Sequence, residues 1–219
     1  MDKKHKNNQV VIAFDLHEVI FSFSYIKFFD SSYKFFEKNP YALTLANPFA
    51  GYRILNTLYA TSKTAENVYN RLTEKHYPWL AASKTEFLLV CNSYILDPEM
   101  KKLLDELESK GYRLAVCSNI GSQAFEHFKN EHPDIFNMFE IIVTSHPERN
   151  YMRKPAQEFF DHFKKDVQQA VPQAKYCVFI DDKKRNVQAA EKLGIHGVVF
   201  KNPKQLRKEL KDLGINVSM

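Results

Sequence analysis

The feature that most constrains the fold is an alternation of short apolar runs with helix-like stretches in the second half of the chain. The runs cover Tyr112–Ser118, Glu140–Ser145, Lys175–Asp182 and Gly197–Phe200. Each is continuously apolar rather than alternating, which is typical of strands buried on both faces of a sheet. Helix-like stretches of about 10–15 residues lie between them. The alternation therefore predicts βαβ units and a parallel sheet.

The stretches between the runs carry helix start and stop signals. Asp97 precedes Pro98, a sequence that suits an N-cap followed by the first helical position. Gly111 closes that stretch, and Gly194 and Gly214 close two later ones. Glycine accepts the left-handed backbone that often ends a helix. These signals predict helices of ordinary length between the strands.

A long segment of different texture separates the first apolar run, Val10–Asp15, from the others. This segment, residues 23–95, is rich in Phe and Tyr and shows no convincing strand. Its pattern predicts helices over Tyr25–Lys38, Phe49–Thr61, Thr64–His76 and Lys84–Tyr94. Aromatic side chains at helical spacing, such as Phe28, Phe29, Phe35 and Phe36, are expected to pack in a core. We therefore expect a core built from residues 1–22 and 96–219, with residues 23–95 inserted as a helical subdomain.

Composition narrows the class of protein. The chain has 219 residues, of which 44% are hydrophobic, so it is long enough for one core that hides roughly 70% of the unfolded surface. It lacks the run of about 18 apolar residues that a membrane span needs. The net charge of +5 is scattered among acidic residues, which weighs against a nucleic-acid partner and fits an anionic small molecule. We expect a monomer or a homodimer without membrane attachment.

The cysteines and the first residues bear on localisation. Cys91, Cys117 and Cys177 are odd in number and lie in or beside apolar runs, which favours free thiols in a reducing compartment. The first apolar run is shorter than the core of about 7–15 residues in a signal peptide. We therefore expect a cytoplasmic protein.

Polar residues follow several of the predicted strands, and one precedes a helix. They are Asp15, Ser118, Asn119, Lys154, Asp181 and Asp182. Ligands of open parallel sheets bind beyond the carboxyl ends of the strands. Clustered carboxylates repel one another unless a cation relieves them, and oxygen ligands without Cys or His favour Mg²⁺. A lysine, a hydroxyl and a helix N-terminus suit a phosphate dianion, which Asp15 could attack as a nucleophile.

Four ordered motifs resemble those of the haloacid dehalogenase superfamily. They read VVIAFDLHEVIF, LAVCSNIG, MRKPAQEFF and VFIDDKKRNVQAAEKLGI. The details are most similar to the branch that holds small sugar-phosphate phosphatases and the phosphatase domain of soluble epoxide hydrolases. The resemblance implies an α/β fold: a Rossmann-like, three-layer core with a central parallel sheet and an inserted α-helical cap.

The resemblance also implies roles at the phosphate end of the site. Asp15 matches the nucleophile and first metal ligand of the family. Ser118 matches its phosphate-binding hydroxyl, with Asn119 beside it. Lys154 matches the lysine that neutralises both the nucleophile and the phosphate.

The metal end of the site follows from the same resemblance. Asp181 and Asp182 match the acids that bind Mg²⁺, and either one could make the direct contact. The backbone carbonyl of His17 takes the position of a further ligand. Asn186 matches a residue near the site that often helps to orient this motif.

The first motif departs from the phosphatase pattern at two positions. His17 stands where the second aspartate acts as acid and base, and Glu18 stands where glycine is usual. Histidine is a competent acid and base, and Glu18 is a less favoured substitute. The sequence thus predicts a Mg²⁺-dependent phosphatase of small phosphomonoesters, for example sugar phosphates, that acts through an aspartyl-phosphate. Two alternatives stay open: a catalytically weak binding or regulatory protein, and a dehalogenase-type hydrolase, which the paired acids disfavour.

Overall fold

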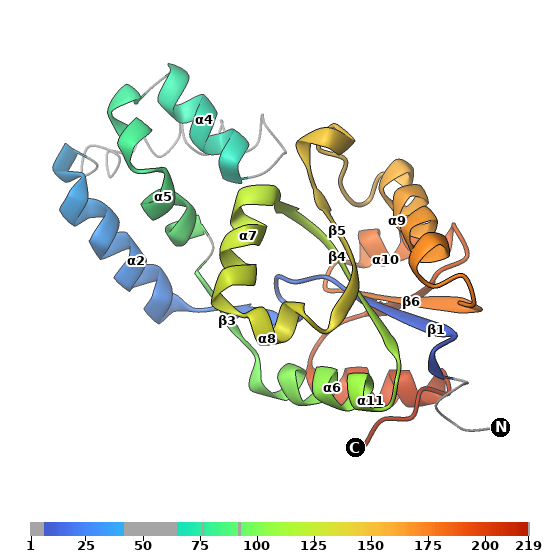
Figure 1. Ribbon diagram of the computed structural model, residues 1–219. Coiled ribbons are helices and arrows are strands. Elements are labelled where there is room, and N and C mark those ends of the chain that lie inside the picture. The colour runs from blue at the N-terminus through green and yellow to red at the C-terminus, as the bar shows by residue number, and fades with distance from the viewer. Residues whose placement is uncertain (1–6, 42–64, 76, 92, 219) are drawn as a thin grey trace.

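The centre of the molecule is a five-stranded parallel sheet in the order β5-β4-β1-β6-β7 (Figure 1). The computed structural model describes residues 7–41, 65–75, 77–91 and 93–218. The strands are β1 (Val10–Phe14), β4 (Arg113–Gly121), β5 (Phe139–Ser145), β6 (Tyr176–Asp181) and β7 (His196–Val199). Each of the five predicted runs forms one of them, so the predicted parallel sheet is confirmed.

Strand β1 shows why these runs are continuously apolar. Ile12 and Phe14 pack into a hydrophobic cluster on one face of the sheet, whereas Val11 and Ala13 pack into a second cluster on the other. Successive side chains of a strand point to opposite faces. Because β1 lies between β4 and β6 with both faces covered, every one of its positions is buried.

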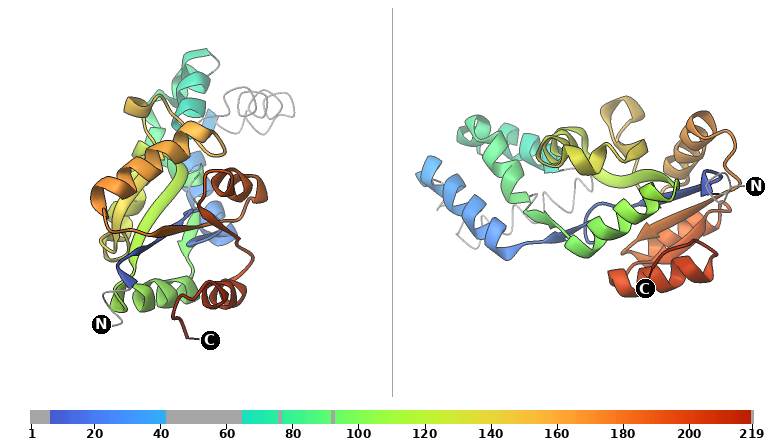
Figure 2. Two further views of the ribbon diagram at one scale, coloured as in Figure 1. Left: turned by 90° about the vertical axis from the view of Figure 1, so that its right-hand side faces the viewer. Right: turned by 60° about the horizontal axis from the view of Figure 1, so that its bottom comes forward.

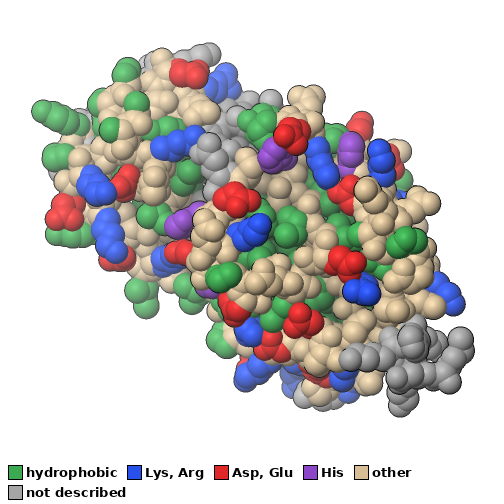
Figure 3. All heavy atoms as spheres, viewed as in Figure 1, with side chains coloured by type: hydrophobic (Ala, Val, Ile, Leu, Met, Phe, Trp, Pro, Cys, Tyr) green, Lys and Arg blue, Asp and Glu red, His purple; other side chains and the backbone are tan. Residues whose placement is uncertain are grey.

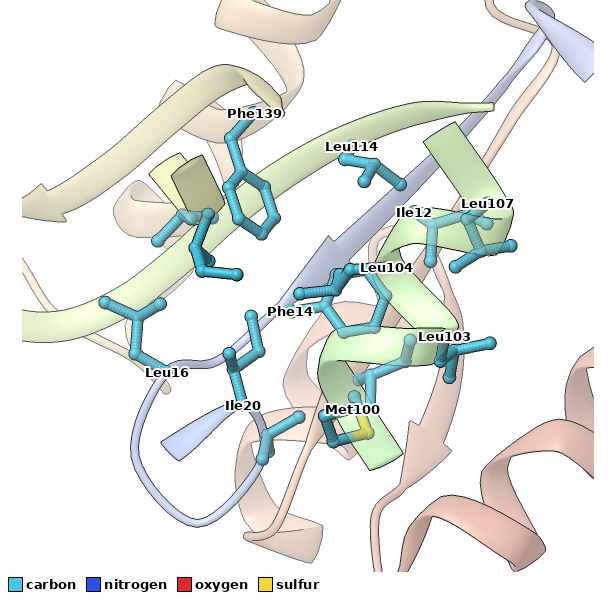
Figure 4. Close-up of a cluster of buried hydrophobic side chains, with 14 of the residues drawn as sticks. Ile12, Phe14, Leu16, Ile20, Met100, Leu103, Leu104, Leu107, Leu114 and Phe139 are labelled. Atoms are coloured by element: carbon cyan, nitrogen blue, oxygen red, sulfur yellow. The ribbon is translucent and has the colours of Figure 1, made fainter. Parts of the chain in front are cut away.

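Helices cover both faces of the sheet (Figure 2). The face of Phe14 is covered by α6 (Pro98–Ser109), α7 (Ser122–Glu131), α8 (Pro133–Phe136) and α11 (Pro203–Asp212). The face of Ala13 is covered by α9 (Gln157–Ala170) and α10 (Lys184–Glu191). Figure 4 shows α6 laying Leu103, Leu104 and Leu107 against the strands. The three-layer α/β architecture predicted from the sequence is thereby confirmed.

Helix boundaries follow the predicted signals. Asp97 caps α6, since its side chain accepts hydrogen bonds from the backbone N–H groups of Glu99 and Met100. Gly194 and Gly214 have φ of +78° and +80° just beyond α10 and α11. A residue with a Cβ is strained at these angles, so glycine is the natural residue to end each helix.

A second group of helices lies between β2 (Phe21–Phe23) and β3 (Tyr94–Leu96), which pair with each other antiparallel. It holds α2 (Tyr25–Lys38), α4 (Ala65–Lys75), the 3₁₀ helix η2 (Pro78–Ala82) and α5 (Lys84–Cys91). These elements share their own cluster of buried side chains, centred on Phe35, Leu72 and Leu80. The helix expected over Phe49–Thr61 lies outside the described residues. The division at residues 23–95 stays a prediction.

The end of this helical segment differs from the prediction. Helix α5 ends at Cys91, and Tyr94 belongs to β3 instead of the helix. The Oγ atom of Ser93 donates to the carbonyls of Leu89 and Val90 and so satisfies groups at the helix end. Pairing of Tyr94 with Phe23 then holds the chain extended, a contact between positions far apart in sequence.

Part of the surface is more apolar than expected. Along α2, Phe35 is buried, but Phe29 is 67% exposed and Phe36 is also exposed, so the expectation that these aromatic residues all pack in a core is wrong. The reason is their angular position, since Phe29 and Phe36 each lie roughly a third of a turn around α2 from the buried Phe35. On the face in Figure 3, basic and acidic side chains are interspersed. Within the described residues, no helix is both long and apolar enough to cross a membrane.

The three cysteines are free thiols. Cys117 is buried in β4, whereas Cys91 at the end of α5 is exposed.

Glu106 anchors the C-terminal residues, and this anchor predicts a pH-dependent stability. Its carboxylate accepts hydrogen bonds from Lys110, Arg207 and Ser218. Burial alone would raise the pKa of Glu106, but these partners together lower it from 4.5 to about 2. A lowered carboxylate pKa stabilises the fold above the unfolded-state value, and this stabilisation is lost as the pH falls through 4.5 towards 2. Glu106→Gln should therefore cost about 1–2 kcal/mol at pH 7, allowing for solvent screening.

Urea unfolding at pH 7 and at pH 3 checks this prediction. The difference between wild type and Glu106→Gln should shrink at pH 3. The matched control is Glu108→Gln, an exposed position on the same helix, which should change stability by less than about 0.5 kcal/mol. An equal effect of the two variants at pH 7 would contradict the anchor.

Candidate active site

The candidate site lies at the carboxyl edge of the sheet, where β1, β4 and β6 end side by side. Asp15 directly follows β1, Ser118 lies in the last part of β4, and Asp181 ends β6. All three side chains belong to buried residues. The backbone N–H of Asp15 donates to the carbonyl of Ile180 at 2.9 Å, which ties the ends of β1 and β6 together. Neighbouring parallel strands thus place two acids and a hydroxyl at one point.

Lys154 is the centre of the site, although it comes from the segment before α9. Its side chain is 0% exposed. The Nζ atom lies 3.0 Å from Asp15 Oδ2 and 2.5 Å from Asp181 Oδ2, and it donates to the carbonyl of Cys117 at 2.7 Å. Burial alone would lower the pKa of Lys154, but the two carboxylates raise it above its ordinary value. The ammonium therefore stays charged and uses its three N–H donors on three acceptors.

Asp15 is held in its ionised form. Burial alone would raise its pKa, but the charge of Lys154 and the hydrogen bonds from Lys154 and Ser118 lower it. The backbone N–H of Leu16 donates to Asp15 Oδ1 at 2.7 Å. The site thus holds an ionised carboxylate, which is the form that acts as a nucleophile.

Asp181 and Asp182 are adjacent in sequence but differ in their surroundings. Both oxygens of Asp181 accept hydrogen bonds: Oδ1 from the Lys183 backbone and Asn186, and Oδ2 from Lys154 and Asn186. Burial raises the pKa of Asp181. The Oδ1 atom of Asp182 is also buried but has no hydrogen-bond partner within the described part of the chain, and Lys183 Nζ lies 3.6 Å away. Asp181 is saturated, whereas Asp182 keeps an oxygen available.

These carboxylates form a cluster that suits a divalent cation. Asp15, Asp181 and Asp182 each offer one oxygen, and the three atoms lie within 4.8 Å of one another. Mg²⁺ takes hard oxygen ligands and usually only one or two carboxylates, with water or phosphate oxygens in the other positions. An unpartnered buried carboxylate oxygen is costly unless it gains a proton or a cation. The chemistry of the donor set therefore fits Mg²⁺.

Asn119 is engaged with the backbone of Lys154. Its Oδ1 accepts from the Lys154 N–H at 2.7 Å, and its Nδ2 donates to the Lys154 carbonyl at 3.0 Å. The amide group thus clamps both backbone groups of the residue whose side chain bridges the acids. The predicted contact of Asn119 with phosphate stays a prediction.

His17 lies on the loop after β1, between two aromatic rings. Its ring stacks on Tyr94 with a centroid distance of 4.2 Å and an interplanar angle of 28°, and Phe128 approaches edge-on at 5.7 Å. Burial lowers the pKa of His17 to about 4, so the ring is neutral near pH 7. Glu18 is exposed and has a φ of 61°, a left-handed conformation that glycine adopts without strain.

Sequence reasoning missed the contact made by Tyr94. The chain reaches Tyr94 on β3, a strand of only three residues in a segment predicted to be helical. Nothing in the local sequence marks it as a neighbour of His17. The pairing of β3 with β2 is what brings the tyrosine back to the site.

The family comparison agrees with this arrangement. A family model described as haloacid dehalogenase-like hydrolase matches residues 10–194, which is most of the chain. The chain belongs to the haloacid dehalogenase-like hydrolases. The matched range runs from β1 through α10 and contains all the residues of the site described above.

Curated relatives of this hydrolase match over limited segments. A sesquiterpene phosphatase from Aspergillus oryzae is 33% identical over 102 residues, which are 47% of this chain and 49% of that protein. A flavin mononucleotide hydrolase from Arabidopsis thaliana is 51% identical over 43 residues, which are 20% of this chain and 18% of that protein. The chain thus spans about half the length of the first relative and less of the second.

Solved structures of other hydrolases in the family share the fold. The HAD-hydrolase YfnB from Bacillus subtilis, bound to magnesium, has a TM-score of 0.63 at 15% identity and covers 93% of this chain and 99% of its own. A family enzyme from Bacteroides thetaiotaomicron, an aspartate-to-alanine mutant in complex with magnesium and inorganic phosphate, has a TM-score of 0.60 at 19% identity. It covers 87% of this chain and 93% of its own. At these identities the likeness shows the fold alone.

Proposed function

We propose that this hydrolase is a Mg²⁺-dependent phosphatase that cleaves phosphate monoesters of small molecules through an aspartyl-phosphate. The observation that carries the proposal is the buried bridge from Lys154 to Asp15 and Asp181, beside the Ser118 hydroxyl. This bridge holds an ionised nucleophile next to a fixed positive charge. Relatives named as a sesquiterpene phosphatase and a flavin mononucleotide hydrolase support the same reaction class.

Asp15 is the nucleophile in this proposal. One of its carboxylate oxygens forms a bond to phosphorus while the bond from phosphorus to the leaving oxygen breaks, and that oxygen takes a proton from a water molecule in contact with His17. The hydroxide left behind becomes water again when it receives the proton that His17 takes up in the second half of the reaction. Lys154 Nζ, 3.0 Å from Asp15 Oδ2, offsets the negative charge that the phosphoryl group brings. Ser118, whose hydroxyl hydrogen-bonds Asp15, turns that hydroxyl to the phosphoryl oxygens.

His17 acts in the second half of the reaction. Water attacks the phosphorus of the aspartyl-phosphate, the bond to the Asp15 oxygen breaks, and inorganic phosphate leaves. The neutral ring of His17 can accept the proton of the attacking water, and because its pKa is lowered to about 4 it passes that proton on instead of holding it near pH 7. We assign this role to His17 rather than to Glu18, because Glu18 is exposed.

The metal would be held mainly by Asp15 and Asp182. Asp182 has a buried oxygen without a hydrogen-bond partner within the described residues, whereas each oxygen of Asp181 already accepts two hydrogen bonds. Asp181 therefore orients Lys154, and the His17 carbonyl stays a predicted further ligand. Mg²⁺, when bound, would supply positive charge that stabilises the phosphoryl oxygens. Asn119 is assigned the task of holding Lys154 in place through its backbone.

The test of the proposed function is phosphate release with and without Mg²⁺. The panel should contain sugar phosphates, flavin mononucleotide and a prenyl phosphate, which span polar, aromatic and aliphatic leaving groups. We expect Mg²⁺-dependent release from at least one ester. If every ester fails while Mg²⁺ and inorganic phosphate still bind, the chain is a binding protein instead. Metal-independent halide release from a haloacid would indicate dehalogenase chemistry.

Replacing each adjacent acid separates their roles. Loss of a residue that only hydrogen-bonds a metal ligand typically weakens metal binding by roughly 10–100-fold. Asp182→Asn removes a proposed direct ligand, so it should weaken Mg²⁺ binding by more than this. Asp181→Asn should change Mg²⁺ affinity less and stability more, because it removes a charged partner of the buried Lys154. Calorimetric titration with Mg²⁺ and urea unfolding of both variants measure the two effects. The opposite ranking in both experiments would transfer the direct metal contact to Asp181.

A further inference from the structure

We propose that Tyr94 is a positioning residue that fixes the imidazole ring of His17 by stacking on it. This inference rests on the proposed function, in which His17 takes the proton of the attacking water. It assigns a positioning task to β3, at the end of the helical segment, since Tyr94 lies on β3 and His17 on the loop after β1.

The ring of His17 needs an orienting partner. A catalytic base is usually oriented by a third group that hydrogen-bonds its other nitrogen. Here the Nε2 atom is buried and has no hydrogen-bond partner among the residues that the structure describes. The contacts that define the plane of the ring are aromatic: Tyr94 stacked at 4.2 Å and Phe128 edge-on at 5.7 Å. The face of the Tyr94 ring therefore orients the imidazole ring, a task that a hydrogen bond would otherwise perform.

Tyr94 is itself held firmly. Its backbone pairs with Phe23 of β2, and its ring meets the Phe23 ring edge-on at 5.5 Å. Its carbonyl accepts a hydrogen bond from Lys27 Nζ at 3.3 Å. Lys27 also forms an ion pair at 3.2 Å with Glu131 of α7, the helix that carries Phe128. The two rings that enclose His17 are thus tied to each other through Lys27.

The hydroxyl of Tyr94 lies close to the acidic residues of the site. Burial, together with the nearby charges of Glu18, Asp182 and Asp15, raises the pKa of Tyr94 to about 12. The phenol therefore stays neutral and cannot itself take the proton from water near pH 7. This leaves the face of the ring as the part of Tyr94 that acts on His17.

The test compares Tyr94→Phe with Tyr94→Leu, each in the wild-type and in the His17→Ala background. Tyr94→Phe keeps the aromatic face, so kcat should stay within about twofold. Tyr94→Leu removes that face, so kcat should fall roughly 10- to 100-fold with little change in KM, as expected when a reacting group is misplaced. In the His17→Ala background, Tyr94→Leu should cost less than about twofold more, because the two residues act as one unit.

A spectroscopic measurement separates this inference from the proposed function. In protein with labelled histidines, the Hε1 signal of His17 should move downfield in Tyr94→Leu, where ring-current shielding is lost, and stay in place in Tyr94→Phe. The other seven histidines serve as internal controls for folding. If wild type releases no phosphate, the proposed function fails, and this signal still tests the stack.

Three results would overturn the inference. The first is an equal loss of kcat from Tyr94→Leu with and without His17. The second is a Tyr94→Phe variant as slow as Tyr94→Leu, which would assign the effect to the hydroxyl. The third is a His17 signal that Tyr94→Leu leaves unmoved.

Discussion

Replacing Lys154 with methionine is expected to destabilise the protein by about 3–5 kcal/mol, because it removes one partner of a buried set of charges. The Lys154 side chain is 0% exposed, and its Nζ contacts both Asp15 and Asp181. Without it, two buried carboxylates repel each other and lose a hydrogen-bond donor. Urea unfolding at pH 7 measures the loss. Phosphate release should disappear as well, since the nucleophile loses its neutralising charge.

A second variant shows whether unpaired charge is the cause. Adding Asp181→Asn to Lys154→Met removes one of the repelling carboxylates, so the double variant should regain part of the lost stability. Lys164→Met is the matched control. Its ammonium donates to the carbonyl of Leu193 at an exposed site, and its loss should cost less than about 1 kcal/mol. Equal destabilisation by the two lysine substitutions would contradict the buried bridge.

The strands of the sheet were largely predictable because burial on both faces is visible in the local sequence of each strand. A strand buried on both faces is apolar at nearly every position, and β1 shows this directly in its sequence. In β6 the residues before Asp181 follow the same pattern. The order β5-β4-β1-β6-β7 was not predictable in the same way. The order of the strands depends on where each crossover helix packs, and the sequence of a strand does not indicate which strands lie beside it.

The short strands escaped prediction for a related reason. Three-residue elements such as β2 and β3 are too short to show a period. What stabilises them is pairing between Phe23 and Tyr94, which lie at opposite ends of the inserted segment. The end of α5 at Cys91 depends on the same pairing, so one long-range contact explains both errors.

The members of the site were easier to foresee than their partners. The carboxyl ends of parallel strands lie at one edge of the sheet, so a parallel sheet was enough to place Asp15, Ser118 and Asp181 at the same edge. The proposed division of roles between Asp181 and Asp182 depends on which oxygens accept hydrogen bonds from Lys154 and Asn186. Such partners are set by side-chain positions that no spacing in the sequence reveals.

Asp15→Asn is expected to lower kcat for the best phosphate ester by more than about 1,000-fold, because an amide cannot replace a carboxylate as nucleophile. The protein should remain folded. Lys154 keeps Asp181 and the Cys117 carbonyl as partners, so the stability change should stay within about 1–2 kcal/mol. Loss of activity with retained stability places the effect in the reaction rather than in the fold.

Acid quenching during turnover tests the covalent step itself. Wild type should carry phosphate bound to protein, and Asp15→Asn should carry none, since the acyl-phosphate bond forms at the Asp15 carboxylate. Asp212→Asn, an exposed change at the end of α11, controls for the substitution and should carry as much bound phosphate as wild type. Phosphate that remains attached to the Asp15→Asn protein would move the nucleophile to another residue. Turnover of wild type without any phosphate bound to the protein would instead favour direct attack of water on phosphorus. In that case the role of Asp15 would be limited to binding the metal.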